Sequence, residues 1–300
     1  AGFSPRRPIE GVAWTNEEGS RFQPGPMGSA VFAGEKPLEA CLGVVDSRGV
    51  RLEDALRASL AATPQAVQRP FRLPVAAYIE AHIEQGPRLE LAGKPIGIVT
   101  GIQGSRWFTI EVEGEEAHAG TTPLAARKDA FRAATAMVQA LQELMADPSD
   151  TVRFTIGRFE VMPGSPNTVP GRVLFTIDFR HPDDATIARL GGPGEPICPA
   201  PARPCPVRVT ETSRHASTWF DRSVVDVVAQ ATDELGYPGM ELFSGAGHDA
   251  RCMAPLCPTA MIFVPCAGGV SHNEAEDASP SDLAAGARVL ATVLRRLADS

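Results

Sequence analysis

The first residues that could do chemistry are Glu17 and Glu18, which stand side by side in "WTNEEGSRF". Neighbouring carboxylates repel, and an isolated Glu-Glu pair usually lies in a solvated turn. The alternative is a division of labour, in which one carboxylate binds a metal ion and the other transfers a proton. The choice between them depends on whether other segments end in similar side chains.

Two other segments do end in this way. The strand-like "AAYIEAHIEQG" finishes with His82, Glu84 and Gln85, and His272 follows the apolar run "AMIFVP" in "GGVSHNEAED". In open α/β sheets, ligands bind beyond the carboxyl ends of the strands, so we expect the three segments to converge. Two imidazoles and a carboxylate suit a hydrolytic zinc or related divalent centre. The sequence therefore predicts a metal site at these strand ends.

Composition and motifs exclude several other classes of protein. The net charge of −8 disfavours nucleic acid and anionic membranes as partners, and no apolar run approaches the roughly 18 residues of a membrane span. "FSGAG" lacks the G-x-S-x-G spacing of serine hydrolases, and "GIVTGIQGS" lacks the G-x-G-x-x-G of dinucleotide sites. The six cysteines form no C-x-x-C pair, which is typical of reduced thiols in a cytoplasmic protein. "AGFSPRRPIE" has no apolar signal-peptide core, so we expect no secretion signal.

Strand-like and helical patterns alternate along the chain, which predicts an α/β architecture. Apolar and alternating runs predict strands over 8–14, 74–87, 105–119, 151–161, 171–181, 205–213 and 259–265. Helical spacing predicts helices over 46–63, 123–147, 183–190, 221–235 and 283–298. The first of these helices would bury Leu52, Ala55, Leu56 and Leu60, and the second Phe131, Ala134, Val138, Leu141 and Met145.

The middle of the chain has an order of its own. Residues 106–215 run β-α-β-β-α-β, a pattern that forms one four-stranded sheet with two helices. We therefore expect a domain of 106–215 inserted into a larger one made of 1–105 and 216–300. Six prolines lie between 191 and 206, so the second helix of the inserted domain should be short, or the stretch a loop.

Six motifs, taken together, resemble those of one enzyme family. They are "AWTNEEGSRF", "AHIEQGPRLE", "EEAHAGTTPL", "GSPNTVPGRVLFTIDFRHPD", "SGAGHDA" and "GGVSHNEAED". The family is the amidase branch of the zinc aminoacylase and carboxypeptidase clan, which contains N-carbamoyl-L-amino-acid hydrolases, allantoate amidohydrolases and β-ureidopropionases. The resemblance implies a sheet-and-helix catalytic domain, and it implies that the inserted domain is a lid and dimerisation domain.

The resemblance also implies a pair of divalent metal ions, zinc or else manganese or cobalt. Glu18 and His272 would bind the second metal and His82 the first, while Glu17 would be the general base for the water between them. The family's N-terminal H-x-D motif and a later bridging aspartate are not found at their places, and no histidine precedes His82. We therefore expect the chain to lack the family's N-terminal segment, with Ala1 not the natural start.

Further roles follow from the same resemblance. His118 would stabilise the oxyanion of the tetrahedral intermediate and would act in the partner subunit of a homodimer. Gln85, Asn167 and Arg180 match substrate-binding positions, and the planar fork of Arg180 suits a substrate carboxylate. Two further residues, His248 and Asp249, would support the metal ligands without binding the metal themselves.

Each assignment has a structural alternative. His82 on a half-buried strand is more often a packed, hydrogen-bonded histidine than a ligand. His118, beside two glutamates, would then lie in a surface turn, and Arg180 would pair with Asp178 or Asp183. His181 and His215 match no catalytic position.

The predicted function is a metal-dependent amidohydrolase that cleaves the ureido C–N bond of an N-carbamoyl-L-amino acid or related ureido acid through a metal-activated water. Three alternatives remain open. The first is an allantoate or ureidoglycolate amidohydrolase, and the second is an aminoacylase or dipeptidase of the same clan. The third is a catalytically inactive truncated homologue that acts as a dimerising or binding module.

Overall fold

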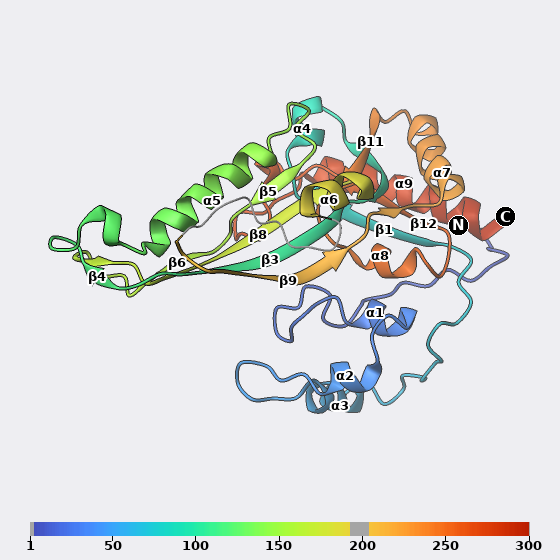
Figure 1. Cartoon of the computed structure of the whole chain (residues 1–300). Coiled ribbons are helices and arrows are strands. Elements are labelled where there is room, and N and C mark those ends of the chain that lie inside the picture. The colour runs from blue at the N-terminus through green and yellow to red at the C-terminus, as the bar shows by residue number, and fades with distance from the viewer. Residues whose placement is uncertain (1–2, 193–203, 300) are drawn as a thin grey trace. The chain divides into compact units, whose positions relative to one another are not determined.

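The computed structural model describes residues 3–192 and 204–299. Most of the proline-rich stretch therefore lies outside the described residues. The chain forms two compact units, one made of Ala1–Ile102 with Thr218–Ser300 and the other of Gln103–Ser217 (Figure 1). The expectation from the sequence placed the inserted domain at 106–215. Each unit has its own sheet and core, and each is described separately below.

The first unit is built on a five-stranded sheet. Its strands are β1 (Tyr78–Ile83), β2 (Ile96–Ile102), β10 (Thr218–Trp219), β11 (Gly239–Ser244) and β12 (Thr259–Val264). They are ordered β1-β12-β2-β10, and β11 also pairs with β2. β12 runs parallel to β1, with His82 opposite Phe263, while β2 is antiparallel to β12. Because β12 is buried along its whole length, it is the central strand next to β1.

Helices pack on this sheet through apolar side chains. They are α7 (Arg222–Glu234), α8 (Asp249–Met253) and α9 (Pro280–Asp299), with the short α4 (Arg88–Ala92) and the 3-10 turn η2 (Ala267–Gly269) following β1 and β12. Val228 of α7 and Val289 of α9 are fully buried in one cluster with Phe263 of β12. Ala250 of α8 belongs to the same cluster. No helix in the described ranges is both long and apolar enough to cross a membrane.

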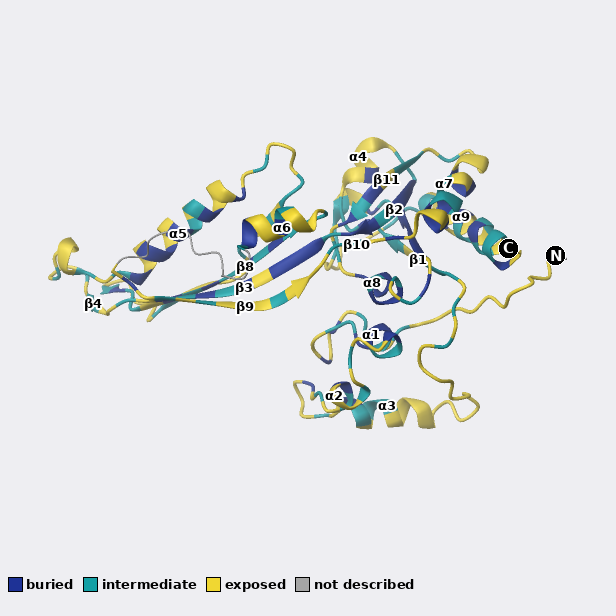
Figure 2. Cartoon of the chain, turned by 45° about the vertical axis from the view of Figure 1, so that its right-hand side comes forward, coloured by how far each residue is buried: buried dark blue, intermediate teal, exposed yellow. Residues whose placement is uncertain are grey.

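The segment before β1 has little regular structure. It contains α1 (Gly28–Ala33), α2 (Leu38–Leu42) and α3 (Leu52–Ala61), and a small cluster joins Phe22, Met27, Cys41 and Leu52. The predicted strand over 8–14 is wrong, because these mostly exposed residues pair with no strand. α3 begins six residues later than predicted, since Asp46 instead accepts hydrogen bonds from the amides of Arg48 and Val50 in a turn. Most of α3 is exposed, Leu60 included (Figure 2).

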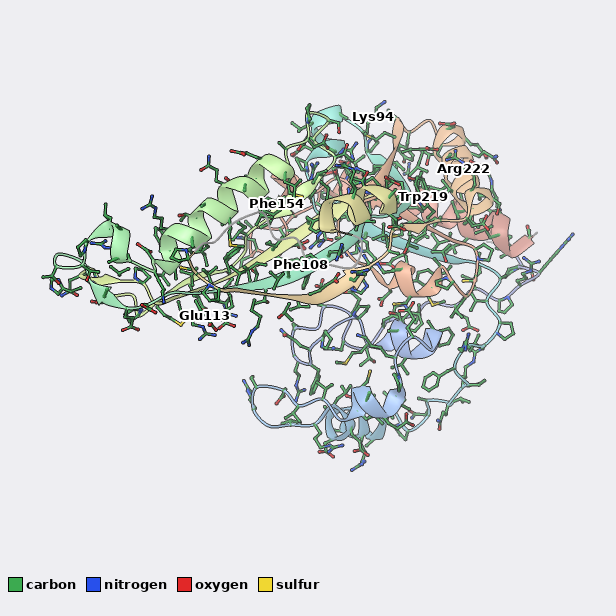
Figure 3. All side chains as sticks on the ribbon, viewed as in Figure 1. Lys94, Phe108, Glu113, Phe154, Trp219 and Arg222 are labelled. Carbon is green, nitrogen blue, oxygen red and sulfur yellow. The ribbon has the colours of Figure 1, made fainter. Side chains whose placement is uncertain are left out.

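The second unit contains the predicted sheet with two helices. Its strands are β3 (Gly104–Glu113), β5 (Arg153–Thr155), β6 (Phe159–Met162), β8 (Arg172–His181) and β9 (Val207–His215). The order is β5-β8-β3-β9, with β6 also on β8. Helices α5 (Ala130–Leu144) and α6 (Asp184–Gly191) pack on one face, where Phe108, Ile110 and Val112 of β3 point into the core. Figure 3 labels Phe108 and, at the end of the same strand, Glu113.

Three predictions for the second unit needed correction. The strand over 151–161 is split into β5 and β6, which pair with different parts of β8. The helix over 123–147 is shorter, because Asp129 caps it by accepting from the amides of Phe131 and Arg132, and 124–126 form only a 3-10 turn, η1 (Leu124–Ala126). Phe131 is 44% exposed instead of buried, since alanines and Met137 form the core side of α5.

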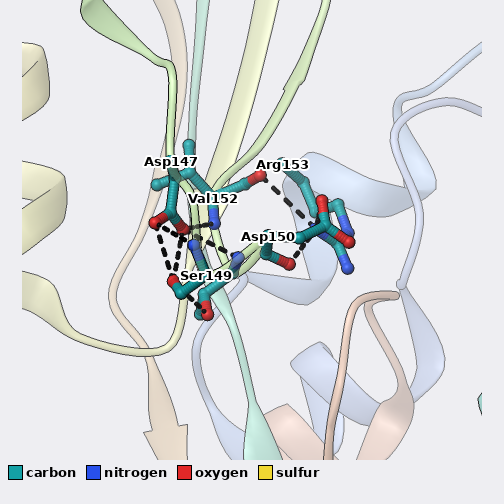
Figure 4. Close-up of polar contacts among 6 residues, drawn as sticks. Asp147, Ser149, Asp150, Val152 and Arg153 are labelled. Carbon is teal, nitrogen blue, oxygen red and sulfur yellow. Dashed lines mark hydrogen bonds and ion pairs between the residues drawn. The ribbon is translucent and has the colours of Figure 1, made fainter.

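The connection from α5 to β5 is held by one carboxylate. Asp147 accepts hydrogen bonds from the amides of Ser149, Thr151 and Val152 and from the Ser149 hydroxyl (Figure 4). These donors, the Ser149 hydroxyl first, hold the pKa of Asp147 well below its usual range. Aspartate is favoured in such turns because its short side chain can bond to the backbone a few residues ahead. The loop is therefore ordered by local polar contacts.

Core packing of the second unit yields a matched pair of substitutions on α5. Leu141 is fully buried, whereas Leu144 is 46% exposed. Leu141→Ala should destabilise the unit by about 2–5 kcal/mol, because it removes buried methylenes and leaves a cavity. Leu144→Ala should cost less than about 1 kcal/mol. Amide hydrogen exchange of β8 in the two variants measures this, and equal protection would contradict the assigned helix face.

An ion pair in the same unit predicts a pH dependence. Hydrogen bonds from Arg214 and from the buried Arg106 lower the pKa of Glu211 to about 2. A carboxylate with a depressed pKa adds stability above its ordinary pKa near 4.5, and this contribution disappears as the pH falls towards 2. Exchange protection of β3 should therefore drop between pH 5 and pH 3 more steeply in the native protein than in Glu211→Gln. Glu113→Gln controls for removal of one acid on the unit, and identical pH profiles for native protein and Glu211→Gln would contradict the argument.

Candidate functional site

The parallel pairing of β1 and β12 brings two of the predicted segments to one edge of the sheet. Beyond the strand ends, Gln85 Nε2 donates a hydrogen bond to Ser271 Oγ at 2.9 Å, next to His272. Glu84 has a structural role there, because its carboxylate accepts from the amides of Arg88 and Leu89 at the start of α4. The two loops are thus tied together directly.

Glu18 and His272 face each other at this edge. Glu18 Oε2 lies 3.7 Å from His272 Nε2, and both side chains are largely exposed. Two ligands that bind one tetrahedral metal ion at 2.0–2.2 Å lie about 3.4 Å apart, so this pair fits a divalent ion with little adjustment. The structure therefore brings together the two residues expected to share a metal.

His82 lies in a different contact. Its ring centroid is 4.7 Å from that of His248, and its Nδ1 lies 2.8 Å from the carbonyl oxygen of Ile83. Within 3–192 and 204–299, no three His, Cys, Asp or Glu side chains are grouped as a metal site. The described residues thus provide one two-ligand pair, while His82 lies against His248 and the Ile83 carbonyl oxygen, and its assignment as a metal ligand stays a prediction.

Glu17 lies among other acids. Partial burial, then the charges of Asp249 and Glu18, raise the pKa of Glu17 to about 7, and His272 partly opposes this. A carboxylate of this kind is held between its protonated and ionised forms at neutral pH. Adjacent in sequence, Glu17 and Glu18 differ in environment, since Glu17 is half-buried and Glu18 is exposed.

The loop that carries both glutamates is closed by Asn16. Asn16 Nδ2 donates to the carbonyl oxygen of Phe22 at 2.6 Å, and the Phe22 amide donates back to Asn16 Oδ1 at 3.3 Å. Gly25 packs against the loop so closely that an added Cβ would lie 2.3 Å from the Glu17 carbonyl oxygen. The backbone direction at Glu17 and Glu18 is therefore set by both contacts.

Unusual backbone conformations concentrate at the candidate site. Five non-glycine residues in the described ranges have positive φ, and three of them are Asn16, Gln85 and His272, at 54°, 57° and 55°. Residues held in this left-handed region cost free energy and persist where surrounding contacts require them, often in functional sites. One such residue occurs in each of the three loops predicted to converge.

His248 and Asp249 lie at the start of α8, both buried. His248 Nε2 is 2.8 Å from Ser244 Oγ, and its Nδ1 is 3.8 Å from Glu80 Oε1. Burial, then His82 and Arg251, lowers the pKa of His248 to about 3, so the ring is neutral. Burial raises the pKa of Asp249, and Ser29 partly opposes this.

Sequence reasoning missed several polar residues around these groups. Asn16, Tyr78, Glu80 and Ser244 all bond to candidate residues or their loops. One signal was available for two of them: Tyr78 and Glu80 alternate with apolar residues on the same strand face as His82. Burial, and to a smaller extent the charges of Asp249 and Glu17, raise the pKa of Glu80 to about 7, although the hydrogen bonds from Tyr78 and the Ala250 amide oppose this.

The remaining candidates belong to the second unit. His118 lies in β4 (Ala117–His118), which pairs with β7 (Thr168–Val169), and the Ala119 amide donates to the carbonyl oxygen of Asn167. His118 Nδ1 accepts from the amides of Gly120 and Thr121 at 3.1 and 3.2 Å. A neutral ring that accepts at Nδ1 carries its proton on Nε2, so His118 presents an N–H donor.

Arg180 is engaged with a neighbouring acid. Its Nε donates to Asp178 Oδ1 at 3.0 Å and its terminal nitrogen donates to Oδ2 at 2.6 Å, a two-point ion pair. This is the pairing that the structural alternative predicted. A substrate carboxylate would therefore have to compete with Asp178 for the fork of Arg180.

Comparison with known proteins agrees with this fold. The model of "Peptidase family M20/M25/M40" matches residues 1–296. An N-carbamoyl-L-amino-acid amidohydrolase of Rhizobium meliloti is 39% identical over 294 residues, covering 96% of this chain and 69% of that protein. An allantoate amidohydrolase of Escherichia coli (strain K12) is 36% identical, covering 98% and 72%. The crystal structure of a hydantoinase/carbamoylase family amidase from Burkholderia multivorans superposes with a TM-score of 0.85 at 40% identity, covering 96% and 70%.

The chain is a hydrolase of mixed α/β fold, with a sheet-and-helix unit and an inserted unit built on a five-stranded sheet. It belongs to peptidase family M20/M25/M40. The resemblance stated from the six motifs is thereby confirmed, as is the fold class. The family as a whole is generally dependent on divalent metal ions.

The closed loop around Asn16 gives a test of its geometry. Asn16→Gly removes both side-chain hydrogen bonds but tolerates positive φ, and should lower the local stability of the loop by about 1 kcal/mol. Asn16→Ala loses the same bonds and also pays for a left-handed backbone, which adds about 1 kcal/mol. Hydrogen exchange of the Phe22 amide reports on this loop, and protection in Asn16→Ala equal to that in Asn16→Gly would contradict the strain argument.

Proposed function

We propose that this protein is a metal-dependent amidohydrolase that cleaves the ureido C–N bond of an N-carbamoyl-L-amino acid or a closely related ureido acid. The observation that supports this most directly is the 3.7 Å approach of Glu18 to His272, with Glu17 adjacent, in a chain of this family. The names of the relatives supply the substrate class: two N-carbamoyl-L-amino-acid amidohydrolases are 39% identical to this chain, and an allantoate amidohydrolase is 36% identical.

The roles of the residues follow from their chemistry. A divalent ion held by Glu18 and His272 would supply Lewis-acid polarisation of the substrate and a lowered pKa for water. Glu17 accepts a proton from the water that attacks the ureido carbonyl carbon, and returns it to the leaving nitrogen. The C–N bond breaks, ammonia leaves, and the resulting carbamate decomposes to the amine and carbon dioxide.

His118 and Arg180 complete the proposal from the second unit. The Nε2–H of His118 is a hydrogen-bond donor suited to the oxyanion of the tetrahedral intermediate. Arg180 binds the substrate carboxylate once its fork exchanges part of its pairing with Asp178. Gln85 and Asn167 contribute amide groups that suit the polar ureido group.

The described residues form only part of a metal site. The described residues supply two ligands of one ion, and a catalytic zinc normally has three from protein. Metal bound by Glu18 and His272 alone should be weak and should need an excess of added ion. An inactive, metal-poor module is therefore the second candidate, and it rests on this observation.

The experiment is ammonia release by purified protein of verified mass, with added Zn²⁺, Mn²⁺ or Co²⁺. N-carbamoyl-L-amino acids and allantoate should be turned over, and N-acyl amino acids and dipeptides should not. Glu17→Gln should lower kcat by about 10²–10⁴-fold, the usual contribution of a general base, while retaining bound metal. Glu10→Gln, at an exposed site paired with Arg69, is the matched control and should act like the native protein.

Two outcomes count against the proposal. Protein that holds metal yet releases no ammonia from any ureido acid would reject it. Well under one metal ion per chain, even with excess ion, would favour the non-catalytic module. Activity confined to dipeptides or N-acyl amino acids would support a peptidase or aminoacylase of the same family.

A further inference from the structure

A chain of hydrogen bonds links three segments of the first unit. Trp14 Nε1 donates to the Tyr78 hydroxyl at 3.1 Å, and that hydroxyl donates to Glu80 Oε2 at 3.0 Å. The same carboxylate oxygen accepts from the backbone amide of Ala250 at 2.8 Å. Each of these segments leads to candidate groups, so the chain of bonds connects the Glu17–Glu18 loop, β1 and the start of α8.

The connections are short along the sequence. Trp14 lies three residues before Glu17, and Ala250 directly follows the buried Asp249. Glu80 lies two residues before His82, so both side chains point to the same face of β1. The Glu80 side chain is only 15% exposed, and its second oxygen lies 3.8 Å from His248 Nδ1.

Aromatic packing also fixes Trp14, the first donor in this chain of hydrogen bonds. The ring of Trp14 lies 5.3 Å from that of Phe32 and 6.5 Å from that of Tyr78, measured between centroids. Trp14 is therefore fixed by contacts as well as by its hydrogen bond. A shift of Tyr78 would move the start of the loop that carries Glu17 and Glu18.

A buried carboxylate is a costly way to fill space. Its desolvation must be offset by hydrogen bonds, and a well-packed apolar side chain stabilises a core at least as well. Hydrogen bonds add direction, which apolar contacts lack. Two donors on one oxygen set the distance between β1 and the start of α8, as well as the orientation of Tyr78.

We propose that Glu80, acting through Tyr78, is a positioning residue that holds the Glu17–Glu18 loop, the end of β1 and the start of α8 in register. It contacts no substrate in this assignment. For its effect on catalysis the proposal rests on the amidohydrolase function, but the positioning itself is measurable without substrate or metal.

The first measurement is amide hydrogen exchange of the metal-free protein, resolved by residue. In Glu80→Ala the Ala250 amide and the amides of 14–18 should exchange at least about 10-fold faster, because their shared anchor is gone. Glu80→Gln should retain most of the protection, since its amide oxygen accepts the same two bonds. Tyr78→Phe should release 14–18 while leaving Ala250 protected.

The chain offers a matched control, because it contains only two tyrosines. Tyr237 also has a bonded hydroxyl, which accepts from Arg288, but it lies outside this network. Tyr237→Phe should leave the exchange of Ala250 and of 14–18 unchanged.

The second measurement is turnover of the ureido acid. Removing a residue that orients a ligand set typically costs 10–100-fold, so Glu80→Ala should lower kcat by this factor with KM changed less than about 3-fold. Glu80→Gln should restore most of kcat. A lower kcat with little change in KM in Glu80→Ala, and recovery of kcat in Glu80→Gln, form a pattern that loss of stability alone would not produce.

Three results would overturn the proposal. Exchange in Glu80→Ala that is unchanged at Ala250 and 14–18 would show that the carboxylate fixes neither segment. Uniformly faster exchange across β2, β11 and α9 would show a role in overall stability alone. Glu80→Gln as impaired as Glu80→Ala would show that hydrogen-bond acceptance is not the cause. If the native protein turns over no substrate, the proposed function fails, while the exchange results still decide the positioning role.

Discussion

Parallel pairing of β1 with β12 is the constraint on which the rest of the candidate site depends. Because the two strands run in the same direction, their carboxyl ends meet at one edge, and the loops after them carry Gln85 and His272. β12 is buried along its whole length, so water does not compete for the hydrogen bonds of its strand pairing. The loops can therefore hold strained backbone, including positive φ at both residues, without disturbing the sheet.

The acidic residues near this edge of the sheet lower the stability of the fold but favour proton transfer. The charge of Asp249 raises the pKa of both Glu17 and Glu80, Glu17 also raises the pKa of Glu80, and burial is the largest cause at all three acids. Such an arrangement costs stability, because acids that repel must be kept together by the surrounding structure. The hydrogen bonds from Tyr78 and the Ala250 amide offset part of that cost at Glu80. Clusters of this kind are typical of sites that transfer protons.

The second unit is built around a sheet with one buried face. Its sheet has one face covered by α5 and α6, and the apolar positions of β3 and β8 alternate accordingly. That alternation made most of its strands, and their order along the chain, predictable from the sequence. Phe131 was misassigned because a helical stripe of apolar residues is wider than the face that is buried, and small alanines took the core side of α5. In the first unit, by contrast, strand β2 was not predicted from the sequence, because its short apolar run was considered only as a possible nucleotide motif.

Most of what the sequence predicted correctly came from short stretches of adjacent residues. Residue types at strand ends predicted which side chains would matter, and six ordered motifs placed the chain in its family, because those features depend on a few adjacent residues. Tertiary structure alone decided which of them meet: Glu18 pairs with His272, His82 packs on His248, and Arg180 is held by Asp178. It also revealed the roles of Tyr78, Glu80 and Asn16, since a hydrogen bond between distant segments leaves no periodic trace in either one. Spacing along a chain determines secondary structure, but the distance between two side chains is set only when the whole core has packed.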